Sequence, residues 1–188
     1  MSVRETELRS LLLRQHIRNA ARRLPPVLRD YARMLAAAAV GFGVLAELLA
    51  WLTPVEPLYS LPALALLFSA QAASYAVRLA RDPDFEVPGC GCGTSVNDDT
   101  ATVLRSRQST ILGVPNSVLG VLLYTALLAA VAADRPTVTV VLALVAGLTS
   151  AYLGYVMVVR LASVCTLCVN VAALNLLILV ELVRQVVV

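Results

Sequence analysis

The sequence is poor in charged side chains, has one histidine and contains no lysine, so that all 15 basic residues are arginine. Charged residues make up 14% of the 188 positions and hydrophobic residues 59%. A soluble domain of this size is nearer a quarter charged and half apolar, so the composition excludes the soluble globular class. The single histidine means that no Cys/His metal-ligand pattern is assembled, and we predict no metal site. We interpret the absence of lysine as a reflection of genome composition.

Five stretches are long and apolar enough to cross a membrane as helices, which takes about 20 mostly apolar residues each. They are Met34–Leu52, Leu58–Val77, Val114–Ala133, Pro136–Val159 and Leu161–Val183. The sequence therefore predicts an all-α, multi-pass integral protein of the cell membrane. Its surroundings are expected to be the lipid bilayer, with no nucleic acid among its partners.

An arginine-rich segment precedes the first of these stretches. Apolar residues fall on one face of a helix from about Glu5 to Leu24, and Pro25-Pro26 is expected to end that helix. We interpret the segment as an amphipathic arm on anionic lipid headgroups, with a solvated helical arm as the alternative. The expected organisation is an arm at 1–30, a first transmembrane helix and short turn at 31–57, and a four-helix core at 58–188 with a long loop at 81–113.

Counting spans places the four cysteines at one face of the membrane. Two spans precede the long loop, which holds Cys90 and Cys92, and two more separate this loop from Cys165 and Cys168. The same face carries the eight arginines that precede the first span, in the arm and at Arg33, and five others, whereas the opposite face has two. Arginine and lysine concentrate in cytoplasmic loops, so the cysteine face is predicted to be cytoplasmic.

Cys165-Thr166-Leu167-Cys168 forms a C-x-x-C motif at the start of the last span. Two cysteines at this spacing in the first turn of a helix can close a disulfide, and the helix N-terminus favours the thiolate of the first. We interpret the motif as redox-active. Half of a metal site and a pair of inert buried cysteines are the alternatives.

Cys90-Gly91-Cys92 is flanked by Gly89 and Gly93, and glycine frees the backbone to swing. A mobile cysteine pair near a fixed one is the arrangement that a thiol–disulfide relay needs, because each exchange passes through a mixed disulfide. Electrons that reach a C-x-x-C at the membrane surface can leave to a lipid-soluble acceptor such as a quinone.

Several polar side chains in the spans are candidates to hydrogen-bond a quinone carbonyl, because polar groups inside a bundle are costly and tend to be functional. These candidates are Asn116, Ser117, Asn170 and Asn175. Since Asn116-Ser117 opens the third span, helix capping is the alternative for this pair.

A longer pattern resembles the vitamin K epoxide reductase family, in particular its bacterial and archaeal members. It consists of Val103-Leu104-Arg105-Ser106, then the G-V-P-N-S-V-L-G of residues 113–120, then two spans joined by a tight turn, then the C-x-x-C. The resemblance covers roughly Cys92 to Val183. It implies a four-helix transmembrane bundle around a quinone, capped by the cysteine loop, with Met34–Leu52 as an extra N-terminal transmembrane helix.

The resemblance also implies roles for individual residues. Cys168 would meet a quinone of the menaquinone or ubiquinone type, and Cys165 would receive electrons from the loop. Asn116 would hydrogen-bond the quinone carbonyl beside Ser117, and Cys92 corresponds to the first loop cysteine. The implied activity is a membrane thiol–disulfide oxidoreductase that takes electrons from a thioredoxin-like thiol protein and so promotes disulfide formation.

Two positions depart from the family pattern. Thr100 stands where the second loop cysteine is usual, which makes Cys90 the other candidate to pair with Cys92. Ala172 stands where animal members have a tyrosine. Two other classes of function stay open at this point: a protein that holds a soft metal such as Zn(II) or Cu(I) with its cysteines, and a non-catalytic membrane subunit.

Overall fold

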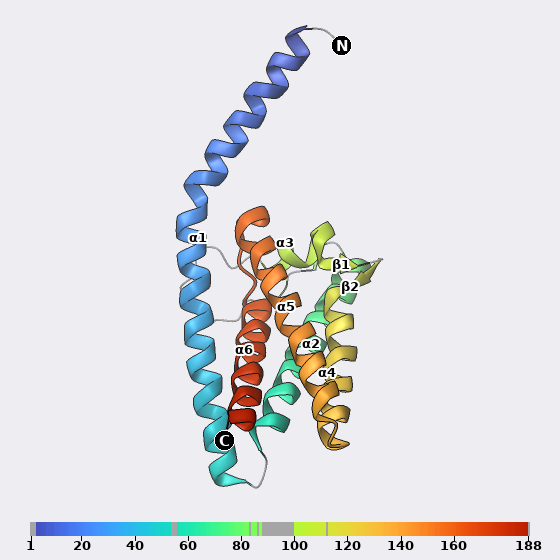
Figure 1. The fold of residues 1–188 in the computed structure, drawn as a ribbon. Coiled ribbons are helices and arrows are strands. Elements are labelled where there is room, and N and C mark those ends of the chain that lie inside the picture. The colour runs from blue at the N-terminus through green and yellow to red at the C-terminus, as the bar shows by residue number, and fades with distance from the viewer. Residues whose placement is uncertain are drawn as a thin grey trace.

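The computed structural model describes residues 3–53, 56–82, 84–85, 87, 100–111 and 113–187, and it shows a bundle of long helices that lie side by side (Figure 1). The long helices are α1 (Val3–Leu52), α2 (Pro57–Arg81), α4 (Asn116–Ala132), α5 (Pro136–Tyr155) and α6 (Thr166–Val187). The short elements are α3 (Thr100–Arg105), the 3-10 helix η1 (Arg107–Ser109), the antiparallel strands β1 (Thr110–Ile111) and β2 (Val114–Pro115), and the π-helix η2 (Val156–Leu161), which continues α5.

Within the described part of the chain, four helices are long and apolar enough to cross a membrane. They cover Pro25–Leu52, Pro57–Arg81, Pro136–Leu161 and Thr166–Gln185. The remaining apolar helix, α4, has 17 residues, which is the lower end of the length that spans a bilayer, and it packs against α2 and α5. The expectation of an all-α, multi-pass membrane bundle is confirmed.

The centre of the bundle is apolar and tightly packed. Leu127 of α4 and Leu174 and Ile178 of α6 are almost completely buried, and they meet small residues such as Ala65 of α2 and Ala143 of α5. Small side chains let helix backbones approach closely, which is how helices associate in lipid. Large apolar side chains point outward instead, where a bilayer would surround them.

One buried polar network joins three of these helices. The Tyr124 hydroxyl of α4 donates to Asn175 Oδ1 of α6 at 2.9 Å, and Asn175 Nδ2 donates to Ser150 Oγ of α5 at 2.6 Å and to the Ala146 carbonyl oxygen at 3.3 Å. Because no water reaches such a position in lipid, these groups must satisfy one another. The network therefore fixes the relative rotation of α4, α5 and α6.

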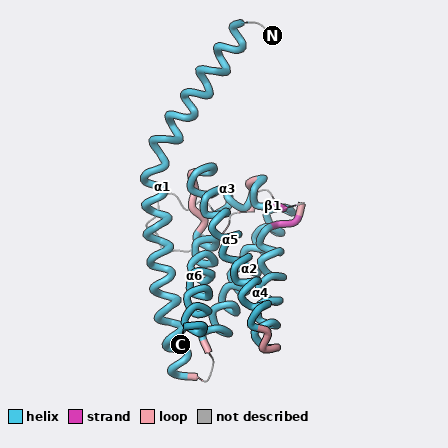
Figure 2. The backbone as a smooth tube through the Cα atoms, in the orientation of Figure 1, coloured by secondary structure: helices cyan, strands magenta, loops and turns pink. Residues whose placement is uncertain are grey.

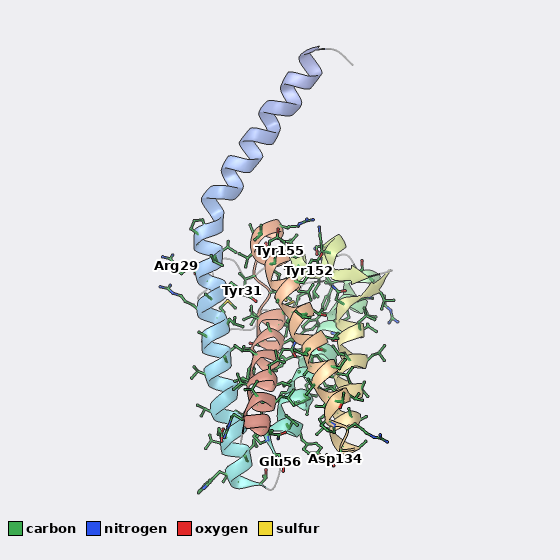
Figure 3. All side chains as sticks on the ribbon, viewed as in Figure 1. Arg29, Tyr31, Glu56, Asp134, Tyr152 and Tyr155 are labelled. Carbon is green, nitrogen blue, oxygen red and sulfur yellow. The ribbon has the colours of Figure 1, made fainter. Side chains whose placement is uncertain are left out.

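The N-terminal arm and the first span form a single helix, and the predicted break at Pro25-Pro26 is wrong. A proline inside a helix removes one backbone hydrogen bond and bends the helix rather than always ending it. α1 changes direction just before Arg29 (Figure 3), and from there it runs along α6. The side chains of residues 3–24 lie outside those described, so the amphipathic face of the arm stays a prediction.

The two ends of the bundle differ in charge. The end that holds α3, the strands and the start of α6 is also the end where the arm projects (Figure 2). Among the side chains that the structure describes, six exposed arginines belong to this end: Arg29, Arg33, Arg78, Arg81, Arg105 and Arg160. Two belong to the other end, namely Arg135 and Arg184. This distribution supports the prediction of a cytoplasmic cysteine end, and Cys90 and Cys92 lie outside the described residues.

The orientation can be tested with two exposed positions at opposite ends, Ala80 and Thr137, each changed to cysteine in a chain whose native cysteines are serine. On intact cells, a membrane-impermeant maleimide is expected to label the Thr137→Cys variant at once. The Ala80→Cys variant is expected to react only after permeabilisation, because positive residues keep its end in the cytoplasm. The reverse pattern would place the cysteine end outside the cell.

Candidate functional site

The start of α6 places the two cysteines of the C-x-x-C. The carbonyl oxygen of Cys165 accepts the N–H of Val169 at 3.0 Å, so Cys165 occupies the N-cap position. Its Sγ accepts the backbone N–H of Cys168 at 3.3 Å, in the place where a serine or aspartate oxygen usually caps a helix. This bond and the positive end of the helix dipole both favour negative charge on Sγ. Burial in an apolar environment opposes that charge, so the local fold fixes the position of the Cys165 sulfur at the helix start.

The two cysteines lie in different surroundings. Cys165 is completely buried in an apolar cluster with Ala72 of α2, Val103 of α3 and Met157 of η2. Cys168 is half-buried and belongs to the wall of a cavity, which Cys165 does not reach. One thiol of the pair is thus held against α3, and the other faces an open space inside the bundle.

The cavity has a volume of about 340 Å³ and lies among α2, α4, α5 and α6, with α3 and η1 over it. Its wall is mostly apolar, from residues such as Leu119, Leu153 and Val171. Cys168, Asn116 and Ser117 contribute to the same wall. An apolar pocket with a few convergent polar groups is the usual form of a small-molecule site, and the structure brings these three sequence-predicted residues together at one.

A tight hairpin positions Asn116. Gly113 adopts φ +81°, a left-handed conformation that suits glycine, and β1 pairs with β2 directly before α4 begins. Asn116 Nδ2 donates to the Gln108 carbonyl oxygen at 3.0 Å and ties the base of α4 to η1. The helix cap is Pro115, without a side-chain bond, so helix capping does not explain Asn116.

The other oxygen of this amide is unusual. Asn116 Oδ1 is buried and has no hydrogen-bond partner within the described residues. Leaving a buried acceptor unsatisfied costs about 1–3 kcal/mol. A ligand with a hydroxyl group in the cavity would satisfy it, and the second N–H of Nδ2 would serve a ligand carbonyl.

Tyr124 is a wall residue that the sequence analysis missed. Asn116, Gly120 and Tyr124 follow one another at intervals of four residues on α4 and all line the cavity. That spacing was the available indication. Asn170 and Asn175, proposed from the sequence as quinone ligands, do not line it; Asn175 is fully engaged in the network with Tyr124 and Ser150.

Comparison with known proteins identifies a family for most of the chain. A family model described as Vitamin K epoxide reductase family matches residues 57–182, about two thirds of the chain. The chain belongs to the vitamin K epoxide reductase family. The match begins with α2 and ends within α6, so α1 lies outside it. No curated protein matches the chain at a significant level.

Membership of the vitamin K epoxide reductase family indicates the general class of activity. The family consists of membrane thiol–disulfide oxidoreductases that work with quinones and generally with thioredoxin-like partners. The expected classification of this chain as a membrane oxidoreductase is confirmed at this level. Which of its residues do the chemistry is a separate question.

The loop cysteines proposed from the sequence, Cys90 and Cys92, lie outside the described residues. The chain re-enters the described structure at Thr100, which begins α3 and is half-buried. Val103, three residues on, packs in the cluster of Cys165. Within the described ranges no group of three or more His, Cys, Asp or Glu side chains converges on a metal-sized site.

Proposed function

We propose that this protein oxidises the thiols of a thioredoxin-like partner and passes the electrons through Cys90/Cys92 and then Cys165/Cys168 to a quinone. The observation that carries the proposal is that Cys168 and Asn116 line the same apolar cavity. A mostly apolar cavity whose wall contains a thiol and an amide with unused hydrogen-bonding capacity fits an acceptor that is apolar in its ring and polar at its oxygens.

The wall residues fit a quinone ring in both of its redox states. The second N–H of Asn116 Nδ2 can donate to a carbonyl oxygen, and Oδ1 can accept from a hydroxyl of the reduced ring. Ser117 supplies a hydroxyl group next to the Asn116 amide in the cavity wall. A bound quinone supplies the capacity to take up two electrons and two protons, and either the menaquinone or the ubiquinone type meets these demands.

The proposed relay conserves electrons at each exchange. A partner dithiol becomes a disulfide as Cys90 and Cys92 become thiols, and this pair then reduces Cys165–Cys168 by attack on Cys165. The Cys165–Cys168 disulfide re-forms when its two electrons and two protons pass to the quinone through Cys168. The position of Cys165 against α3, away from the cavity, supports its role as the side of the pair that meets the loop.

The partner is proposed to be a cytoplasmic thioredoxin-like protein. The exposed arginines at the cysteine end support the cytoplasmic orientation, because positively charged residues concentrate on the cytoplasmic side of membrane proteins. The arm projects from the same end (Figure 1). A thiol pool on that side would be the source of the electrons.

The decisive experiment measures quinone reduction by purified protein supplied with a reduced dithiol protein. Wild type is expected to reduce a short-chain quinone, and Cys168→Ser is expected to abolish that activity because no disulfide can re-form. The Cys168→Ser variant should still form a mixed disulfide with the partner through its loop cysteines. Wild-type rates in Cys168→Ser would refute the assignment, and inactive wild-type protein would refute the function.

Removing the amide of Asn116 tests the quinone site. Asn116→Ala is expected to raise KM for quinone roughly tenfold, because one buried hydrogen bond contributes about 1–1.5 kcal/mol. The matched control is Asn170→Ala, since Asn170 is a half-buried asparagine that does not line the cavity. A lower unfolding temperature with an unchanged KM would instead show that Asn116 only ties η1 to α4.

The tight loop pair has its own test. Disulfide mapping of oxidised protein by mass spectrometry is expected to find Cys90 bonded to Cys92, and Cys90→Ser is expected to stall the relay at a Cys92–Cys165 bond. Adding Thr100→Cys to that variant should restore turnover, because it installs a second thiol in the loop. Full activity in Cys90→Ser alone would show that Cys90 takes no part.

A further inference from the structure

Helix α1 lies outside the matched family region, yet one of its side chains belongs to the cysteine site. Tyr31 is half-buried and reaches from α1 toward the bundle (Figure 3). We infer that Tyr31 is a positioning residue that holds the C-x-x-C segment against α1 and keeps Cys168 turned toward the cavity. The inference rests on the proposed function in one respect, namely that Cys168 is the thiol that serves the cavity.

Tyr31 packs against two apolar clusters at once. One contains Cys165, Met157 and Leu167, and both Tyr31 and Cys168 pack against it. The other contains Val164 and Val169, the residues directly before Cys165 and after Cys168. A single ring from α1 therefore packs against the two clusters that contain the C-x-x-C motif and the residues that flank it.

Gly154 shows how closely this tyrosine fits. A Cβ atom added at Gly154 would lie 2.5 Å from Tyr31 Oη and 3.2 Å from its Cζ, so any larger residue at this position would force the phenol to shift. Gly154 comes two residues before η2, whose irregular π-helical turn leads into Ala162, with φ +48°, and on to Cys165. π-helical turns are frequent at functional sites. Tyr31 thus packs beside both the π-helical turn η2 and the C-x-x-C motif that follows it.

The position of Tyr31 relative to the cavity completes the argument. Cys168 contributes to the cavity wall, whereas Tyr31 does not. Cys168 therefore lines the cavity and also packs against the cluster that Tyr31 contacts. Removing the ring would open space behind the thiol, and a side chain at a helix start would be free to turn into that space.

Four variants test this arrangement: Tyr31→Ala, Tyr31→Phe, Gly154→Ala and the double variant Tyr31→Phe/Gly154→Ala. The first readout is the rate at which iodoacetamide alkylates Cys168 in reduced full-length protein, followed by mass spectrometry. The second is the separate measurement of kcat and KM for a short-chain quinone. Tyr152→Ala is the control, because Tyr152 of α5 is 59% exposed and outside both clusters.

Tyr31→Ala and Gly154→Ala are expected to speed alkylation of Cys168 about fivefold or more by loosening its surroundings, and to lower kcat while KM holds. Tyr31→Phe should behave as wild type, because the ring remains. The double variant should lie closer to wild type than Gly154→Ala, because loss of the hydroxyl relieves the clash. This rescue separates a specific fit from general destabilisation.

Wild-type alkylation and kcat in Tyr31→Ala would overturn the inference, as would a double variant no better than Gly154→Ala. A chain that reduces no quinone would refute the proposed function, while the alkylation rates would still decide the role of Tyr31.

Discussion

The hydrogen bonds of Asn175 are the constraint on which the arrangement of the bundle depends. They join α6 to α4 through Tyr124 and to α5 through Ser150 in a largely apolar interior. In lipid, the hydrophobic effect does not draw helices together, so packing and interhelical hydrogen bonds decide which faces meet. With the three helices fixed in rotation, the Asn116 face of α4 and the Cys168 face of α6 turn toward one cavity.

The start of α6 places the two cysteines in different surroundings, which suit different roles. Cys165 is fully buried, acts as the N-cap and lies against α3, while Cys168, one turn later, reaches the cavity. An exchange chain needs this separation, because one sulfur must meet an incoming thiol and the other an electron acceptor. Because Cys165 and Cys168 are one helical turn apart, one sulfur can face the incoming thiol and the other the electron acceptor without any movement of the backbone.

The additional helix α1 extends the family framework rather than merely adding a membrane anchor. It follows α6 along the bundle and is joined to it near the far end by the Glu47–Arg184 ion pair at 3.0 Å. That pair is exposed and adds little stability by itself. Closer to the cysteines, the contact of Tyr31 with the C-x-x-C segment makes α1 part of the site's surroundings.

The sequence by itself determined the membrane character of the protein and the approximate bounds of its spans, because the length of a hydrophobic run is a local property. It also indicated Cys165, Cys168 and Asn116 as candidate site residues, because spacing within one short motif is local too. It did not predict the uninterrupted α1, since helix-breaking preference at Pro25-Pro26 is a weak local tendency that a long helix overrides with a bend. Only the tertiary structure decided the partners of Asn175 and the fit of Tyr31 to Gly154, because residues far apart in the chain meet according to how helices pair and rotate.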